Sequence, residues 1–195
     1  MDRGVVEEWA AAVIDQLSRS GVIMSPGLRD RDVEEVDEAF GVPLPEELVC
    51  VLRAGVPASP KWARWWDGPK AVARDAREWI DNVFRFDIEQ GQYWHPTFGE
   101  RPEDDSEAVH QALAIVHAAP PLIPIYAHRF LTTTPANGPR AVLSVWQPID
   151  SIVYGNDLAD YFAREFKIDR PTWATTDQPP VPVREDLFDL FCVGQ

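Results

Sequence analysis

Residues 120–166 decide the fold of this chain, and they read PPLIPIYAHRFLTTTPANGPRAVLSVWQPIDSIVYGNDLADYFAREF. Residues 122–127 and 141–147 are rich in β-branched, large aliphatic and aromatic side chains, which favour extended strands. Residues 132–140 between them hold two prolines, an asparagine and a glycine, which are typical of turns. The pattern predicts an antiparallel hairpin with a long loop.

A third strand and a helix follow this hairpin. Residues 151–154 form the predicted strand, and Gly155 ends it. Asn156 or Asp157 can accept the first free amide protons of a helix. Four apolar residues then recur at the spacing of one helical face, namely Leu158, Tyr161, Phe162 and Phe166. We therefore expect the helix to bury this face.

The N-terminal part of the chain predicts three helices. Apolar residues recur at helical spacing in residues 5–19, 30–40 and 45–54. A glycine follows within two residues of each segment, where it suits the left-handed residue that ends a helix. Pro45 fits the first position of the third helix, because that position needs no amide donor.

The middle of the chain, residues 56–119, is less regular. Residues 71–82 predict a helix, and residues 83–88 alternate polar and apolar side chains, which is typical of a half-buried strand. Residues 91–102 form a predicted aromatic loop. A further helix is expected from Glu103 to shortly before Pro120.

Length and composition indicate one self-sufficient domain. The chain has 195 residues, of which 45% are hydrophobic, and a chain of this size buries roughly 70% of its unfolded surface. We therefore predict a single domain over 1–195. Cys50 and Cys192 are the only cysteines, and no close cysteine or histidine spacing surrounds them, so neither a disulfide framework nor a metal site is predicted.

The strong negative charge bears on the kind of partner. The formal net charge is −14, whereas a nucleic-acid binder needs a basic field to displace counterions from phosphates. A basic protein partner is favoured instead. The alternative is that an acidic surface simply keeps the protein soluble. The N-terminal region has no apolar run suited to a signal or a membrane span, so we expect a cytoplasmic protein without a membrane partner.

Two acidic clusters are the candidate contact surface for a partner. One belongs to the predicted helix 30–40, and the other opens the helix that follows the aromatic loop. Their residues are Glu34, Glu35, Asp37, Glu38, Glu103, Asp104, Asp105 and Glu107.

Residues 61–77 combine five basic residues with Trp62, Trp65 and Trp66. Basic residues among aromatics can form a platform on which nucleic-acid bases stack. Alternatively, the tryptophans cover the core while the arginines stack on them or pair with acidic neighbours. The sequence leaves open whether residues 62–66 belong to the core or to an interface, although the charge of the whole chain opposes nucleic acid.

No catalytic motif is present, and no cofactor is predicted. The histidines form no zinc-hydrolase pair on a helix, and there is no nucleophile elbow, phosphate loop or dinucleotide fingerprint. His128 follows a predicted strand, where residues often line a site, or it makes a structural hydrogen bond to the next loop. Five residues are the candidate lining of a cleft, namely Trp94, His95, His128, Arg129 and Tyr154.

The string GLRDRDVEEVDEAFGVPLPEELVCVLRAG, residues 27–55, resembles the opening of the SUKH superfamily, the Smi/Knr cell-wall-regulator-like domains. The matching positions are Phe40, Gly41, Leu44, Pro45 and Leu48. The strings LIPI at 122–125 and VYGNDLADYFAREF at 153–166 resemble the second half of the family's pattern. Two features depart from it: Ala54 stands where the family commonly has asparagine, and the 56–119 insert is enlarged.

The resemblance implies an α+β fold in which N-terminal helices pack on a twisted, mainly antiparallel sheet, with a helical and aromatic insert. It also implies a protein-binding module, of which many bacterial members are immunity proteins that neutralise toxins, and thus a basic toxin domain as partner. A scaffold or regulator of a cellular protein is the alternative, and an enzyme using the His128 region is a third. The tail, residues 167–195, is expected to wrap the domain and to dock a short helix at 185–191.

Overall fold

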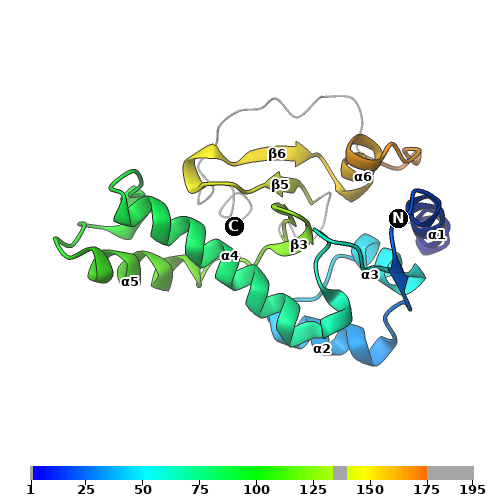
Figure 1. The fold of residues 1–195 in the computed structure, drawn as a ribbon, viewed down its shortest axis with the longest axis horizontal. Coiled ribbons are helices and arrows are strands. Elements are labelled where there is room, and N and C mark those ends of the chain that lie inside the picture. Colours follow the sequence, from blue (N-terminus) through cyan, green and yellow to red (C-terminus); the bar gives the residue numbers. More distant parts are fainter. Residues whose placement is uncertain (1, 134–139, 175–195) are drawn as a thin grey trace.

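The computed structural model describes residues 2–133 and 140–174 and shows a mixed α+β fold with antiparallel sheets (Figure 1). The helices are α1 (Arg3–Arg19), α2 (Asp30–Phe40), α3 (Glu46–Ala54), α4 (Pro69–Glu89), α5 (Asp105–Val116) and α6 (Leu158–Phe166). Three single-turn helices are η1 (Trp65–Asp67), η2 (Pro96–Phe98) and η3 (Pro148–Asp150). The strands are β1 (Met24–Ser25), β2 (Val56–Pro57), β3 (Ile123–Tyr126), β4 (Arg129–Leu131), β5 (Val142–Ser144) and β6 (Ile152–Gly155).

The main sheet has the order β3-β4-β5-β6, with every neighbouring pair antiparallel. The predicted pairing of residues 122–127 with residues 141–147 is wrong, because β4 lies between them. A tight turn at Ala127, with φ of 50°, reverses the chain from β3 into β4. The chain between β4 and β5 includes the predicted loop at 132–140, of which residues 134–139 lie outside the described residues. β1 and β2 pair separately as a small second sheet.

Both faces of the main sheet are buried against helices. Neighbouring strand residues point to opposite faces, so Phe130 enters one cluster of apolar side chains and Leu131 enters the other. The cluster that contains Leu131 also holds side chains of α1, α3 and α6, whereas the cluster that contains Phe130 also holds side chains of α4 and α5. Figure 1 shows α4 running beneath the sheet, while α1, α3 and α6 gather at the other end of the molecule. Helices on both sides are therefore required to cover the strands.

α4 continues through residues 83–88, so the predicted strand there is wrong. Its buried apolar side chains recur every four residues, at Val72, Ala76, Ile80, Phe84 and Ile88. A short window that contains Phe84, Phe86 and Ile88 fits a two-residue repeat equally well. The helical repeat that begins earlier in α4 decides the outcome, and it leaves Phe86 55% exposed.

α4 and α5 form an antiparallel helical hairpin that extends away from the sheet (Figure 1). Residues 90–104 connect the two helices and contain η2. Tyr93 and Phe98 of this connection are buried against Phe84, with ring centroids 5.6 and 6.3 Å from it. The predicted aromatic loop is therefore the packed end of the hairpin.

α6 begins where the sequence placed it. The Asp157 side chain accepts a hydrogen bond from the Asp160 amide at 2.7 Å and so caps the helix. Asp160 is itself buried, and its carboxylate accepts hydrogen bonds from Arg164, Arg170 and Asn156. This network fixes the first turn of α6 to the end of β6 and to the segment that follows the helix.

The start of the C-terminal tail packs on α1. The ring of Trp173 meets that of Trp9 edge-on with centroids 5.3 Å apart, and Ala174 is buried. The rest of the predicted wrapping tail lies outside the described residues, and so does the predicted helix at 185–191.

Gly155 provides a test of the contact between β6 and α6. A β-carbon at this position would lie 2.7 Å from the Tyr161 β-carbon and 2.9 Å from its α-carbon. We expect Gly155→Ala to lower the free energy of unfolding by about 1–3 kcal/mol, because backbone must move to admit the methyl group. Urea denaturation measures the change.

The matched control for this variant is Gly4→Ala in α1. A β-carbon there would meet only the Asp2 carboxylate, at 3.4 Å, and alanine favours a helix more than glycine does. The Gly4→Ala protein should be as stable as the native one or more so. An equal loss of stability in both variants would contradict the close approach at Gly155.

Candidate functional site

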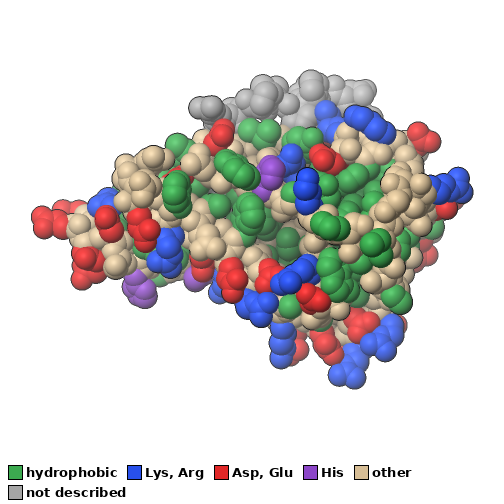
Figure 2. Space-filling view, viewed as in Figure 1, with side chains coloured by type: hydrophobic (Ala, Val, Ile, Leu, Met, Phe, Trp, Pro, Cys, Tyr) green, Lys and Arg blue, Asp and Glu red, His purple; other side chains and the backbone are tan. Residues whose placement is uncertain are grey.

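An exposed group of apolar side chains lies where α4 passes the end of β5. Trp79, Val83, Phe86 and Trp146, which we call the aromatic face, line a surface hollow of about 540 Å³ together with Asn82 and Gln147. Phe86 is 55% exposed and Trp146 is 59% exposed. Ile149 in η3, a segment that contacts α4, is also exposed. Figure 2 shows apolar side chains on this side of the molecule between α4 and the sheet.

The helical repeat of α4 and the segment that follows β5 create this face. Residues 79, 83 and 86 follow i, i+4, i+7 spacing and therefore share one side of α4. The Trp79 indole Nε1 donates a hydrogen bond of 3.2 Å to the Val145 carbonyl, which fixes α4 beside the end of β5. Val145, directly after β5, is fully buried, whereas the next residue, Trp146, is exposed.

A buried carboxyl group lies beneath the aromatic face. Asp87 of α4 is fully buried, and its Oδ1 accepts a hydrogen bond of 3.2 Å from Gln147 Nε2. Asp87 Oδ2 is buried without a hydrogen-bond partner among the described residues. Burial raises the pKa of this carboxyl above its ordinary value, because an apolar site disfavours the charged form. The contact with Gln147 ties the segment after Trp146 to α4.

His128 and Arg129 lie near one edge of this surface. The His128 ring meets the Trp146 ring edge-on, with centroids 5.3 Å apart, so it extends the aromatic face. Burial and the neighbouring Arg129 charge lower the pKa of His128, which favours the neutral ring at this apolar contact. The Arg129 guanidinium lies over the Tyr154 ring at 4.2 Å and donates a hydrogen bond of 3.0 Å to Ser144 Oγ.

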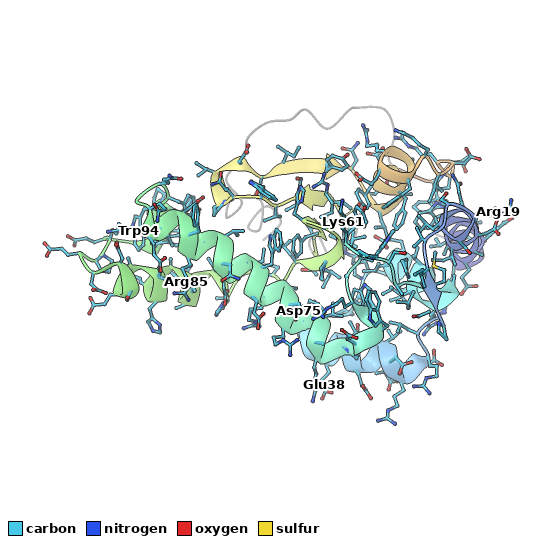
Figure 3. All side chains as sticks on the ribbon, in the orientation of Figure 1. Arg19, Glu38, Lys61, Asp75, Arg85 and Trp94 are labelled. Atoms are coloured by element: carbon cyan, nitrogen blue, oxygen red, sulfur yellow. The ribbon has the colours of Figure 1, made fainter. Side chains whose placement is uncertain are left out.

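The five residues of the predicted cleft fall into two separate places. His128, Arg129 and Tyr154 belong to the sheet and its turns. Trp94 and His95 belong to the connection at the far end of the α4–α5 hairpin, where Figure 3 labels Trp94. Trp94 Nε1 donates to the Gly99 carbonyl at 2.7 Å, and His95 Nδ1 accepts from the Thr97 amide at 3.2 Å. These two residues thus make local contacts that shape the connection.

The two predicted acidic clusters also lie apart. Figure 3 places Glu38 beside α2, whereas Figure 2 shows acidic side chains at the end of the α4–α5 hairpin. Asp37 accepts a hydrogen bond from the Leu44 amide at 2.7 Å and so joins α2 to the start of α3. Asp104 caps α5 by accepting from the Glu107 amide at 2.9 Å.

The other acidic residues of these clusters are paired or exposed. Glu35 pairs with Arg31 at 2.9 Å, and Asp105 pairs with Arg101 at 2.5 Å. Glu34, Glu38, Glu103 and Glu107 are exposed.

The basic and aromatic stretch mostly joins the core. Trp62 and Trp65 are buried, and only Trp66 of the three is substantially exposed. The Trp62 ring stacks on the Phe166 ring with centroids 5.0 Å apart and planes 18° from parallel. Arg64 pairs with Asp75 at 2.7 Å. Trp62 and Trp65 therefore offer no free ring face for stacking with a nucleic-acid base.

The described part of the chain holds no group of three or more histidine, cysteine, aspartate or glutamate side chains placed to bind a metal ion. Cys50 is buried, and burial raises the pKa of its thiol. None of the helices within 2–133 and 140–174 combines the length and the apolar character needed to cross a bilayer.

No protein-family model, no curated protein and no solved structure matches this chain. The resemblance to the SUKH superfamily therefore stays a prediction. Among the chain's own residues, those of the aromatic face offer the most prominent exposed apolar surface.

Asp87 provides a test of the contact beneath this face. A raised pKa in the folded protein means that the folded state binds more protons than the unfolded state between the two pKa values. The contribution of Asp87 to the free energy of unfolding should therefore fall as the pH rises from the ordinary aspartate value towards the raised one.

We expect the Asp87→Asn variant to lose this part of the pH dependence, because an amide does not titrate. Urea denaturation at several pH values between 4 and 7 measures the difference between the two proteins. Parallel stability profiles for the native protein and the variant would show that the buried carboxyl does not titrate as proposed.

Proposed function

We propose that this protein is a binding module for another protein and that it holds its partner through the aromatic face. The observation that supports this is the exposure of Phe86 and Trp146 around one hollow. Large exposed apolar patches are uncommon on proteins that act alone, and tryptophan is enriched among the residues that dominate binding energy. A partner side chain inserted into the hollow would remove both rings from water.

A basic partner fits the charge of the chain. The net charge of −14 favours encounter with a positively charged protein, and acidic side chains gather at the end of the hairpin that α4 forms with α5 (Figure 2). Charges around an interface raise the rate of association more than they lengthen the life of the complex. We therefore assign attraction to the acidic hairpin end and affinity to the aromatic face.

The partner we propose is a toxin domain with a basic surface, and the protein is then an immunity or antitoxin-like protein of the cytoplasm. The resemblance of residues 27–55 and 153–166 to SUKH domains supports this choice. A scaffold or regulator of a cellular protein could use the same face. A gene for a secreted toxin directly upstream separates the two, because only the first needs a cognate toxin.

Substitution of the aromatic face tests the binding function. We expect the Phe86→Ser, Trp146→Ser double variant to bind its partner at least 100-fold more weakly than the native protein does, since hot-spot residues each contribute about 2 kcal/mol or more to the binding free energy. Both side chains are more than half exposed, so the variant should remain folded. Co-purification from the native host at low and high salt, followed by mass spectrometry, identifies the partner, and calorimetry with that partner measures affinity.

Trp66→Ser is the matched control, because Trp66 is 39% exposed and lies on η1 outside the aromatic face. It should bind as the native protein does. If the immunity function is correct, the native protein and this control also protect cells from the toxin, and the double variant does not. Retention of the partner by the double variant would contradict the proposed surface.

A further inference from the structure

A second hollow, distinct from the aromatic face, lies between α2, α4 and the end of α5. We call it the basic groove, and its volume is about 350 Å³. Its apolar lining comes from the C-terminal end of α2, from α4, and from residues 116–122. Six of these lining residues are Ala39, Phe40, Ala76, Ile80, Val116 and Leu122.

Three cationic side chains of α4 also line this groove. Lys70, Arg74 and Arg77 follow i, i+4, i+7 spacing, which places them on one side of the helix. Arg74 pairs with Asp75 at 2.9 Å. Within the described residues, no carboxylate lies at ion-pair distance from Lys70 or Arg77. These two charges are therefore available to an anion, although the chain as a whole is strongly acidic.

The groove has space for a ligand because part of its lining consists of small side chains. Ala73 and Ala76 of α4 belong to the lining, and longer side chains at these positions would fill the space. His117 and Asp81, whose Nε2 and Oδ1 atoms are 2.6 Å apart, also belong to the lining. The volume is at the lower end of the roughly 300–1,000 Å³ that small-molecule sites occupy.

We propose that the basic groove binds an amphiphilic anion. Its apolar body lies against the alanines and the apolar residues of α2 and of residues 116–122. Its carboxylate or phosphate head group accepts hydrogen bonds from Lys70 and Arg77, which both donors can make to either head group. Lys70 and Arg77 are exposed and gain no charge-assisted hydrogen bond from an uncharged ligand of the same shape, so charge as well as shape selects the ligand.

This site is independent of the proposed partner surface. Residues 70, 74 and 77 and residues 79, 83 and 86 point to different sides of α4, because successive side chains turn by about 100° along a helix. The two surfaces can therefore be changed one at a time. Failure of one proposal leaves the other unaffected.

Calorimetric titration of the full chain tests the proposal with octanoate, octyl phosphate, 1-octanol and inorganic phosphate as probes. We expect one saturable site for octanoate or octyl phosphate, with a dissociation constant of about 1 mM or tighter. The tighter of the two identifies the head group. 1-Octanol and inorganic phosphate should each bind at least tenfold more weakly, because each lacks one of the two recognised parts.

Variants of α4 make the test specific. Lys70→Glu with Arg77→Glu should weaken the tighter probe at least tenfold, and Ala73→Leu should weaken it by filling the groove. Arg85→Glu, a charge reversal on the same helix but outside the groove, is the control and should bind as the native protein does. The Phe86→Ser, Trp146→Ser variant should also bind normally.

Three outcomes would overturn the proposal. The first is the absence of saturable binding by either anionic amphiphile. The second is binding of 1-octanol as tight as that of octanoate, which would make the cations irrelevant. The third is unchanged binding by both the charge-reversal variant and Ala73→Leu, each shown to be folded by thermal unfolding, because the ligand would then lie elsewhere.

Discussion

Burial of the main sheet on both faces is the constraint on which the rest of the structure depends. The strands are short, and adjacent residues such as Phe130 and Leu131 must reach two different apolar clusters. No single layer of helices can cover both faces, so α1, α3 and α6 cover one while α4 and α5 cover the other. A one-residue change of register would exchange the two sets of side chains, which strongly specifies the pairing.

α4 connects the buried sheet with the surface of the molecule. Its 21 residues span about 30 Å, which is longer than the sheet requires. One side packs in the core, a second side carries the aromatic face and a third lines the basic groove. The hydrogen bond from Trp79 to Val145 fixes the position of the helix against the sheet. The rotation of α4 about its own axis therefore determines what both surfaces present to a ligand.

Much of this fold can be predicted from the sequence where capping and periodicity agree. The predicted and observed bounds of α2 are the same. Asp157 caps α6 as predicted, and the sequence signal is an aspartate directly before a strong apolar repeat. β4 cannot be predicted in this way, because a strand of three residues that begins with Arg129 is too short to show a repeat of polar and apolar side chains. Residues 83–88 are wrongly predicted as a strand, because a window of six residues cannot distinguish the two-residue period of a strand from the 3.6-residue period of a helix. Once α4 is extended to residue 89, the i, i+4, i+7 spacing of Trp79, Val83 and Phe86 makes the aromatic face visible in the sequence.

The sequence indicates the acidic residues as candidate contacts for a partner, but in the structure several of them cap helices or form ion pairs. Asp37 and Asp104 accept hydrogen bonds that join or begin helices, and Glu35 and Asp105 already pair with arginines. A side chain that is engaged in this way has less to gain from a new partner, because the old contact must first be broken. Phe86 and Trp146 each leave more than half of their surface in water, so burying that apolar surface under a partner gives a net gain in free energy. This difference is why affinity in the proposed complex depends on the aromatic face, while the acidic residues set the long-range field.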